Sequence, residues 1–302
     1  MIIHDSHIHF FSPGFFATLA QQGGPGLQSR PEGIAASIGW DDPVSPAALA
    51  DRWVEALDRH GVSRAALMAS LPGDARSVAQ ALGRHPDRFV GYFMLDPTQE
   101  GAVAYATSAL DAGLRTVCLF PAMHRYSLTD TRVAAVFDLV SARGGNPSGL
   151  PAVFVHCGVL SVGVRKKLGL PSPFEMRFGN PLDLHPLALK HPGVPIIIPH
   201  FGAGLLREAL MLADLCPNVH LDTSSSNGWI RYTPGLTLEA VFKTALEVVG
   251  PERLLFGTDS SFFPRGWNRE VYERQKAALD AIGASAGVQA KIFGGNFERL
   301  FP

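Results

Sequence analysis

Two histidines near the N-terminus have the spacing of a metal-binding pair. The segment reads Asp5-Ser6-His7-Ile8-His9 and has the character of a β-strand. Residues i and i+2 of a strand point to the same side, so His7 and His9 would project together. Neighbouring imidazoles of this kind are ligands that zinc prefers. On its own the pair is a weak signal, because strand histidines also serve purely structural roles.

Three further apolar runs each end in a residue that can bind a metal or take up a proton. They are His156 after Val-Phe-Val, His200 after Ile-Ile-Ile-Pro, and Asp259 after Leu-Leu-Phe-Gly-Thr. Each could instead cap the helix that follows it. If the strands belong to one parallel barrel, however, their carboxyl ends meet at the mouth where barrel enzymes build their active sites. Four histidines and an aspartate at such ends are hard to explain as helix caps.

The elements that must position these side chains alternate regularly along the chain. Strand-like runs are expected at 2–9, 64–70, 89–95, 115–120, 152–156, 195–199, 219–222 and 253–257. Helix-like segments are expected at 46–60, 75–84, 100–112, 131–142, 181–190, 203–214, 237–248 and 268–282. This alternation predicts an α/β fold, a single (β/α)8 TIM barrel domain over residues 1–302 that could be distorted. The alternative, an open doubly wound sheet, should carry a G-x-G-x-x-G turn after a strand, and the sequence has none.

Two connections are longer than usual for such a fold. Residues 10–44 hold four phenylalanines with several glycines and prolines, and residues 157–180 follow the fifth strand. Connections of this length are often functional lids. For the first one, a surface insertion without function is an equal alternative. The sequence leaves open whether either acts as a lid.

Composition excludes several classes of protein. The 302 residues carry 26 basic and 27 acidic side chains, a net charge of −1, whereas nucleic-acid-binding domains are normally clearly basic. No apolar run reaches the ~18 residues of a membrane helix, and the N-terminus lacks the features of a signal peptide. Three scattered cysteines form neither a disulfide framework nor a thiolate zinc site. We therefore expect a cytoplasmic protein with no nucleic-acid or membrane partner, and homo-oligomerisation is left open.

Taken together, the motifs resemble those of the amidohydrolase superfamily, and more closely its amidohydrolase-2 branch. That branch contains aminocarboxymuconate semialdehyde decarboxylase, resorcylate decarboxylase and pyrone dicarboxylate lactonase. The resemblance rests on D-S-H-I-H, V-H-C-G, P-H-F-G, F-G-T-D and the closing F-G-G-N-F-E-R-L-F, and it spans nearly the whole chain.

The resemblance implies a role for each strand-end residue. His7, His9, His156 and Asp259 would bind one divalent metal, most often zinc, with manganese as the alternative. His200 would be the catalytic histidine that holds or deprotonates the water at the metal. Asp259 could take up a proton as well as bind the metal. Zinc lowers the pKa of bound water to ~7, so hydroxide becomes available near neutral pH.

Two local features bear on the kind of metal site and reaction. Binuclear relatives place a carboxylated lysine or a glutamate on the fourth strand, but here that strand reads Thr-Val-Cys-Leu-Phe, which favours a mononuclear site. Its Cys118 is expected to be a small buried residue. Some decarboxylases of the branch carry Glu-x-His on the first strand, whereas this chain has His-x-His. The difference leans slightly away from that subgroup, although other decarboxylases of the branch keep both histidines.

The loops beyond the expected strand ends indicate the substrate. Those after strands four, five, seven and eight carry seven basic and two acidic residues besides Asp259, an excess of five positive charges. A cationic mouth attracts anions, and arginine can bind a carboxylate bidentately. We therefore expect a small anionic organic substrate, such as a lactone dicarboxylate or an aromatic acid. The candidate substrate-binding residues are Arg125, Arg265, His124, Trp229 and Arg177.

Two of these candidates have alternatives. His124 could be a second general acid or a structural histidine, and Trp229 could stack on a planar substrate or pack beneath a loop. About half of the basic side chains could simply face water.

Three functions are compatible with such a site. The preferred one is a metal-dependent hydrolase that opens a carboxylate-bearing lactone, ester or amide through a metal-activated water. The alternative is a metal-dependent non-oxidative decarboxylase of an aromatic or muconate-type acid. The third is a barrel that binds a small acid without turnover, which the presence of all five chemical residues argues against.

Overall fold

Eight parallel β-strands form the centre of the molecule. The computed structural model describes residues 1–23, 33–144 and 151–302. In this part of the chain the strands form one sheet in sequence order. They are β1 Ile3–Phe10, β2 Val62–Ala69, β3 Phe89–Leu95, β4 Thr116–Leu119, β5 Ala152–Val155, β6 Ile196–Ile198, β7 Val219–Asp222 and β8 Leu254–Leu255. Each strand lies within or overlaps a run that the sequence predicts.

The chain after β8 returns to β1 and nearly closes the barrel. The amide of Asp259 donates to the carbonyl oxygen of His7 at 2.9 Å, and the amide of His9 donates to that of Ser260 at 2.7 Å. Ile8 and Ser260 also form a parallel bridge. The strands therefore form the (β/α)8 barrel that the alternation of elements predicts.

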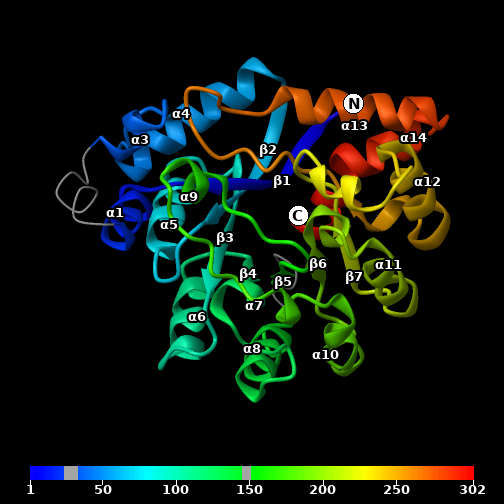
Figure 1. Cartoon of the computed structure of the whole chain (residues 1–302), viewed down its shortest axis with the longest axis horizontal. Helices are drawn as coiled ribbons and strands as arrows, with labels where there is room; N and C mark the ends of the chain where they lie inside the picture. The colour runs from blue at the N-terminus through cyan, green and yellow to red at the C-terminus, as the bar shows by residue number, and fades with distance from the viewer. Residues whose placement is uncertain (24–32, 145–150) are drawn as a thin grey trace.

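Helices surround the strands (Figure 1). Those that follow the predicted segments are α4 Pro46–Arg59, α5 Ala75–Arg84, α6 Ala102–Asp111, α8 Thr131–Ser141, α10 His185–Lys190, α11 Leu206–Leu215, α12 Leu238–Val249 and α13 Arg269–Ala281. Their starts follow from local chemistry: in α4 the Ser45 hydroxyl accepts from the Ala48 amide at 3.3 Å, and Pro46 occupies the first turn. No helix among the described residues is long and apolar enough to cross a membrane.

Short 3₁₀ turns complete several connections. They lie at Met176–Phe178, Pro181–Leu184, Pro199–Gly202, Gly228–Tyr232 and Pro251–Arg253. The segment predicted as one helix at 181–190 is therefore a 3₁₀ turn followed by α10.

Side chains fill the barrel interior, and the end of the chain covers one of its openings. Tyr92, Cys118 and Phe154 are buried inside the barrel, as expected for Cys118. The last helix, α15 (Asn296–Leu300), follows α14 (Ala286–Ala290) and a π-helix (Lys291–Gly295), and its Phe297 packs into the same interior cluster. The closing motif of the sequence therefore has a structural role here.

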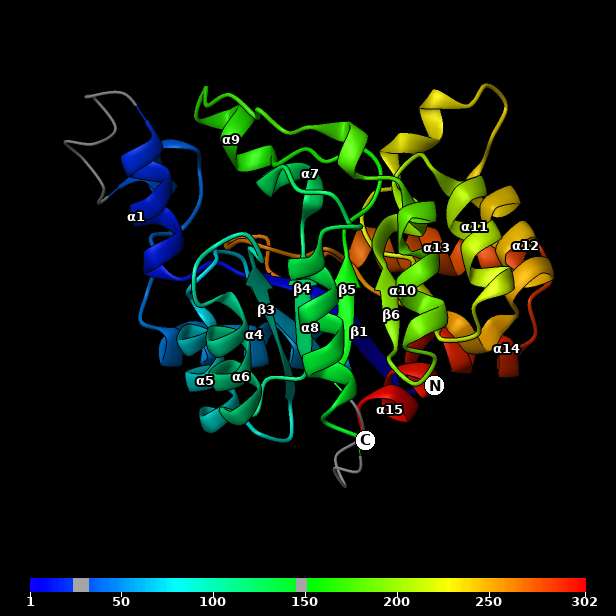
Figure 2. The ribbon, with the colours of Figure 1, turned by 90° about the horizontal axis from the view of Figure 1, so that it is seen from below.

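The two long connections contain helices that the sequence does not predict. The first holds α1 (Pro13–Gln22) and α3 (Ile34–Ser37), and the second holds α9 (Gly163–Lys167). Residues 24–32 of the first connection lie outside the described residues. Figure 2 shows α1, α9 and α7 (Pro121–His124) at one end of the barrel, away from both chain termini.

The two connections share an apolar cluster. It joins side chains of α1 and α3 to side chains in and after α9: Phe15, Phe16, Leu19, Ala20, Ile34, Ala35, Trp40, Val164 and Leu170. The two connections therefore pack together, because each buries apolar side chains of the other.

Candidate functional site

Three of the predicted ligands come together at the carboxyl ends of β1 and β8. Ligand atoms of His7, His9 and Asp259 all lie within 4.8 Å of one another. Asp259 Oδ1 is 3.1 Å from His9 Nε2 and 3.8 Å from His7 Nε2. Two ligand atoms that each lie about 2.1 Å from one tetrahedral zinc ion are about 3.4 Å apart. The spacing of this group, called the metal cluster below, therefore fits one divalent ion.

A bulge in β1 lies at the first histidine. Asp5 pairs with Ala65 and Ile8 with Leu67, so β1 holds one residue more than β2 between the two pairs. Bulges of this kind reorient side chains next to active sites. Ile8 packs into the apolar layer around the barrel, whereas His7 faces its mouth.

Asp5 holds this bulge against β8. Its carboxylate accepts hydrogen bonds from the amide of His7 at 3.0 Å and from the hydroxyl of Thr258 at 2.5 Å. It also accepts from the indole N–H of Trp267 at 2.7 Å. Burial raises the pKa of Asp5 to about 6, although these hydrogen bonds act in the opposite direction.

A buried carboxylate determines the tautomer of His7. The Nδ1 atom lies 2.7 Å from Oδ2 of Asp222, and a carboxylate at this distance accepts the Nδ1 proton. The Nε2 atom is then the one that offers a lone pair. It is buried and has no hydrogen-bond partner among the described residues. A bound metal ion would satisfy this nitrogen.

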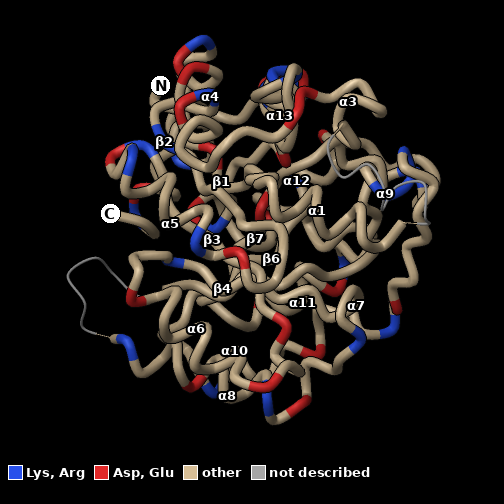
Figure 3. Tube along the Cα trace, turned by 90° about the vertical axis from the view of Figure 1, so that its left-hand side faces the viewer, with Lys and Arg blue, Asp and Glu red and all other residues tan. Residues whose placement is uncertain are grey.

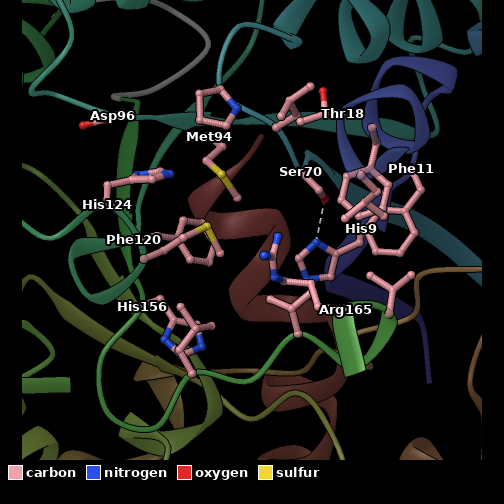
Figure 4. A pocket seen from close by; sticks show the side chains of 18 of the residues that line it. His9, Phe11, Thr18, Ser70, Met94, Asp96, Phe120, His124, His156 and Arg165 are labelled. Atoms are coloured by element: carbon pink, nitrogen blue, oxygen red, sulfur yellow. Dashed lines mark hydrogen bonds between the residues drawn. The ribbon is translucent and has the colours of Figure 1, made fainter. Parts of the chain in front are cut away.

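A hydroxyl determines the tautomer of His9 in the same way. The Nδ1 atom lies 2.6 Å from the hydroxyl of Ser70 (Figure 4), and that hydroxyl donates its own proton to the carbonyl oxygen of Met68 at 3.0 Å. Ser70 therefore accepts from Nδ1 of His9. Nε2 of His9 then faces Oδ1 of Asp259 at 3.1 Å, where a bound metal ion would replace the proton that this pair shares.

The charges around the metal cluster favour a cation. Burial lowers the pKa of His7, but the charges of Asp222 and Asp259 and the Asp222 hydrogen bond outweigh burial and raise it. Burial raises the pKa of Asp259, but the hydrogen bond and charge of His9, together with the charge of His7, hold it well below its usual range. The negative charge of Asp259 beside Nε2 of His7 and of His9 therefore stabilises a proton or a metal ion between these atoms.

His200 and His156 lie beside the metal cluster without belonging to it. The ring centroid of His200 is 5.2 Å from that of His7 and 5.3 Å from that of His156. Burial lowers the pKa of both His156 and His200, which favours the neutral imidazoles that a metal site needs. The structure brings all five predicted residues together, and their individual roles stay predictions.

Ser224 fixes the ring of His200. Nδ1 of His200 lies 2.9 Å from the Ser224 hydroxyl and 3.2 Å from the Ser224 carbonyl oxygen. A carbonyl oxygen can only accept, so Nδ1 carries the proton in that contact and Nε2 offers a lone pair. A histidine in this state can take up a proton from a neighbouring water molecule.

The backbone at two of these residues is left-handed, which is uncommon for residues with a side chain. His200 has a φ of 56° and Asp259 a φ of 58°. Such conformations cost on the order of 1–3 kcal/mol and gather at active sites. Gly257 permits a close approach of His7 and Ser224, since a Cβ at this position would lie 2.9 Å from the Cβ atoms of both.

A cavity of about 1100 Å³ opens in front of these residues. Its walls come from the ends of several strands and from α1, α7 and the α9 region. Figure 4 shows His9 and Phe11 on one side of it and His124 and His156 on the other. Apolar side chains make up much of the lining. The cavity beside the metal cluster is thus mainly hydrophobic, which is typical of a ligand pocket.

Two of the five candidate substrate-binding residues line this cavity. Arg265 lies at the rim, with its guanidinium 4.3 Å from the ring centroid of Phe262. His124 lines the opposite side, and burial lowers its pKa against the attraction of Asp96. Arg265 is therefore the candidate best placed to bind an anion.

The other three candidates lie outside the cavity lining. The guanidinium of Arg125 donates to the carbonyl oxygen of Pro173 at 2.7 Å. Trp229 is buried, and its indole N–H donates to the side chain of Asn227 at 3.0 Å, so it packs beneath a loop. Arg177 is exposed. Their side chains are already used in holding loops together or face water.

The charge of the cavity lining is more balanced than the loop sequence suggests. Three of the seven basic loop residues line it: Arg165, Lys167 and Arg265. Three acidic residues line it as well, namely Asp96 and Glu100 after β3 and Asp259 after β8. Figure 3 shows the basic residues of α9 in blue at this end of the molecule. Cations therefore lie at one side of the mouth instead of surrounding it.

Several residues of the site are absent from the sequence-based set. Asp222 ends the strand Val-His-Leu with a polar side chain, which is the same signal that marks His156 and His200. Ser70 and Ser224 carry no comparable signal, because serine after a strand is common and their contacts join distant segments. Asp222 could therefore have been predicted, and the two serines could not.

Comparison with known proteins gives one family and several similar folds. A family model described as Amidohydrolase matches residues 4–302. Among curated proteins, protein fluG of Emericella nidulans is 34% identical over 85 residues, which are 28% of this chain and 10% of fluG. The match therefore covers just over a quarter of this chain and a small part of fluG.

Two solved structures illustrate the similarity of fold. A probable 2-pyrone-4,6-dicarboxylic acid hydrolase from Acinetobacter baumannii, with citric acid bound, superposes with a TM-score of 0.62 at 16% identity, covering 100% of this chain and 99% of that one. An amidohydrolase from Burkholderia multivorans with bound zinc superposes with a TM-score of 0.61 at 16% identity, covering 100% of both chains. At these identities the likeness is one of fold.

Proposed function

The chain belongs to the amidohydrolase family, and from this premise we propose that it is a metal-dependent hydrolase of a small lactone, ester or amide that bears a carboxylate. The observation that carries the proposal is the metal cluster, in which two histidines offer Nε2 lone pairs to the same space as an ionised carboxylate. We propose further that residues 1–302 work as one catalytic domain.

The donor set suits zinc. Neutral imidazoles and a carboxylate are ligands that zinc binds well. We propose His7, His9 and Asp259 as ligands, with His156 as the fourth protein ligand beside them. The zinc in the Burkholderia structure supports this choice of metal, and manganese is the alternative. A zinc ion held there would lower the pKa of a water molecule to about 7 and polarise a carbonyl oxygen.

The chain's own residues supply the remaining steps. His200 accepts a proton at Nε2 from the attacking water, while Ser224 keeps its ring in place. The water oxygen bonds to the carbonyl carbon, the bond to the leaving oxygen or nitrogen breaks, and the proton passes to that leaving group. Arg265 at the rim holds the substrate carboxylate.

The test combines metal analysis with turnover. His200→Asn should keep its metal content and lose roughly 10²–10⁴-fold in kcat, because a general base contributes about that much. His85→Asn is the control, since His85 pairs with Asp51 away from the cavity and its replacement should leave kcat unchanged.

Turnover is measured as acid release from carboxylated lactones and as carbon dioxide release from hydroxybenzoates. A protein without bound metal, or a fully active His200→Asn, would contradict the proposal. Carbon dioxide release without lactone opening would identify the decarboxylase instead.

A further inference from the structure

The cavity is larger and more apolar than a small dicarboxylate needs. Its volume of about 1100 Å³ lies above the range of roughly 300–1,000 Å³ that is usual for ligand pockets. Six of its apolar lining residues come from four separate segments of the chain: Phe11, Leu19, Trp40, Met94, Phe120 and Phe262. Apolar surface of this extent is poorly matched to a ligand that is polar throughout.

Four aromatic rings form a continuous wall on one side of the cavity. This aromatic wall consists of Phe15, Phe11, Trp40 and Phe262, and all four line the cavity. Neighbouring ring centroids are 4.0 Å, 6.0 Å and 4.3 Å apart in that order, and the planes are within 17° of parallel. Such rings hold their shape with little conformational freedom, so the wall is preformed before a ligand arrives.

The aromatic wall meets the metal cluster at Phe11, its second ring. The ring centroid of Phe11 is 5.6 Å from that of His9, one of the proposed ligands. A ligand whose reacting bond lies at the cluster can therefore place an adjoining group directly along the wall. The wall and the metal cluster therefore belong to one binding site, because both line the same cavity.

Cations lie against the wall at Phe262 and at Trp40. The guanidinium of Arg265 stacks on Phe262 at 4.3 Å and interacts electrostatically with Asp259 of the metal cluster. The Lys167 ammonium lies 5.8 Å from the ring centroid of Trp40. Arg165, on α9, donates to the side chain of Gln22 at the end of α1 and to the carbonyl oxygen of Pro171. Arg265 and Lys167 are thus the cations placed to meet a ligand that lies along the wall.

We infer that the substrate is an amphiphilic acid derivative, with a carboxylate bound at Arg265 and a bulky hydrophobic group that packs against the aromatic wall. This inference rests on the proposed function only for its reacting bond, which lies at the metal cluster. The hydrophobic group distinguishes it from the compact dicarboxylate or simple aromatic acid that the loop charges alone suggest.

Binding of unreactive acids tests the inference without any turnover. The probes are butyrate, succinate, 4-phenylbutyrate and 3-phenylpropylamine, titrated by calorimetry into the full-length protein before and after metal removal with a chelator. We expect 4-phenylbutyrate to bind at least about tenfold more tightly than butyrate or succinate, because burying a phenyl group against apolar surface is worth about that factor. The amine should bind more weakly than 4-phenylbutyrate, since it carries no carboxylate.

Two variants and one control locate the effect. Phe262→Ala removes a half-buried ring at the rim of the cavity, and Trp40→Ala removes a second ring of the wall. With two variants, the test still stands if one of them fails to fold. Either should reduce the preference for 4-phenylbutyrate over butyrate by at least about fivefold, measured as the ratio of the two affinities so that a loss common to both acids cancels. Tyr232→Ala is the control, because Tyr232 is exposed outside the cavity lining.

Each outcome decides the matter. Equal affinity for 4-phenylbutyrate and butyrate, or an unchanged preference in both variants, would overturn the inference while lactone turnover could still support the hydrolase. An amine that binds as tightly as 4-phenylbutyrate would overturn the carboxylate part. If the protein binds no metal but still prefers 4-phenylbutyrate over butyrate, the inference about the substrate stands and the proposed metal-dependent hydrolysis is wrong.

Discussion

Asp222 decides which nitrogen of His7 faces the proposed metal. Its Oδ2 accepts the Nδ1 proton of His7 at 2.7 Å, and its Oδ1 accepts the amide of Ser224 at 2.6 Å. The side chain is fully buried, so neither donor can turn to water instead. Asp222→Asn leaves one side-chain oxygen for two donors. When that oxygen stays on the Ser224 amide, the new NH₂ group faces Nδ1 of His7, and the Ser224 hydroxyl, 3.0 Å from Nδ1, remains as a weaker acceptor for the Nδ1 proton. The preference for the Nδ1 tautomer is therefore reduced, and part of the population carries the proton on Nε2, the atom that should bind the metal.

The magnitude follows from this tautomer change. Loss of a residue that orients a metal-bound histidine typically costs 10–100-fold in metal affinity, which corresponds to about 1.4–2.8 kcal/mol. The same variant leaves a buried donor without a good acceptor, and this costs on the order of 1–3 kcal/mol of folding free energy. We therefore expect weaker metal binding together with a lower urea midpoint.

The assay is competition for zinc between the protein and a chromogenic chelator at constant pH. Asp138→Asn is the matched control, because Asp138 is an exposed aspartate that pairs with Lys190 on the outer surface. Circular dichroism establishes that both variants are folded. A folded Asp222→Asn protein with the zinc affinity of the parent would refute the reasoning that Asp222 sets the tautomer of His7.

Three further predictions concern stability and reactivity. Gly257→Ala should cost about 1–3 kcal/mol in urea unfolding because its Cβ would overlap two others, whereas Gly83→Ala, with open space around it in α5, should be neutral or stabilising. Burial and two nearby arginines lower the pKa of His220 to about 4 from 6.5, so between these pH values the unfolded chain binds a proton that the native protein does not. Stability should therefore fall by about 3 kcal/mol as the pH drops from 6.5 to 4, and His220→Gln should lose that share of the pH dependence. Finally, a thiol reagent should label the native protein slowly and the urea-unfolded protein fully, since every cysteine is buried: Cys118, Cys157 and Cys216.

The barrel was predictable because its signals are local. Each strand is a short apolar run, and each main helix has its own start and its own apolar face, as α4 shows with Ser45 and the buried Trp53. The helices inside the long connections were not predictable in this way. α1 and α9 are short, and their apolar side chains are buried against each other across more than a hundred residues. A packing partner so distant leaves no periodicity in either segment.

The same distinction separates the ligand residues from the substrate-binding residues. A side chain at the end of a barrel strand must face the mouth, so His156, His200 and Asp259 could be placed from the strand positions alone. A loop side chain has no such constraint. Arg125 and Trp229 turn to backbone and side-chain partners within their own loops, and nothing in the spacing of the sequence records those partners.

The residues that hold the proposed ligands come from different strands than the ligands themselves. His7 and His9 both lie on β1, but Asp222 ends β7 and Ser70 follows β2, so the two strands that orient them lie on opposite sides of β1. Both tautomers are therefore correct only when the barrel is nearly closed, with the chain after β8 hydrogen-bonded to β1. Closure of the barrel and assembly of the metal cluster are then one structural event. This explains why a local motif as weak as His-x-His becomes a strong indication once a barrel is predicted around it.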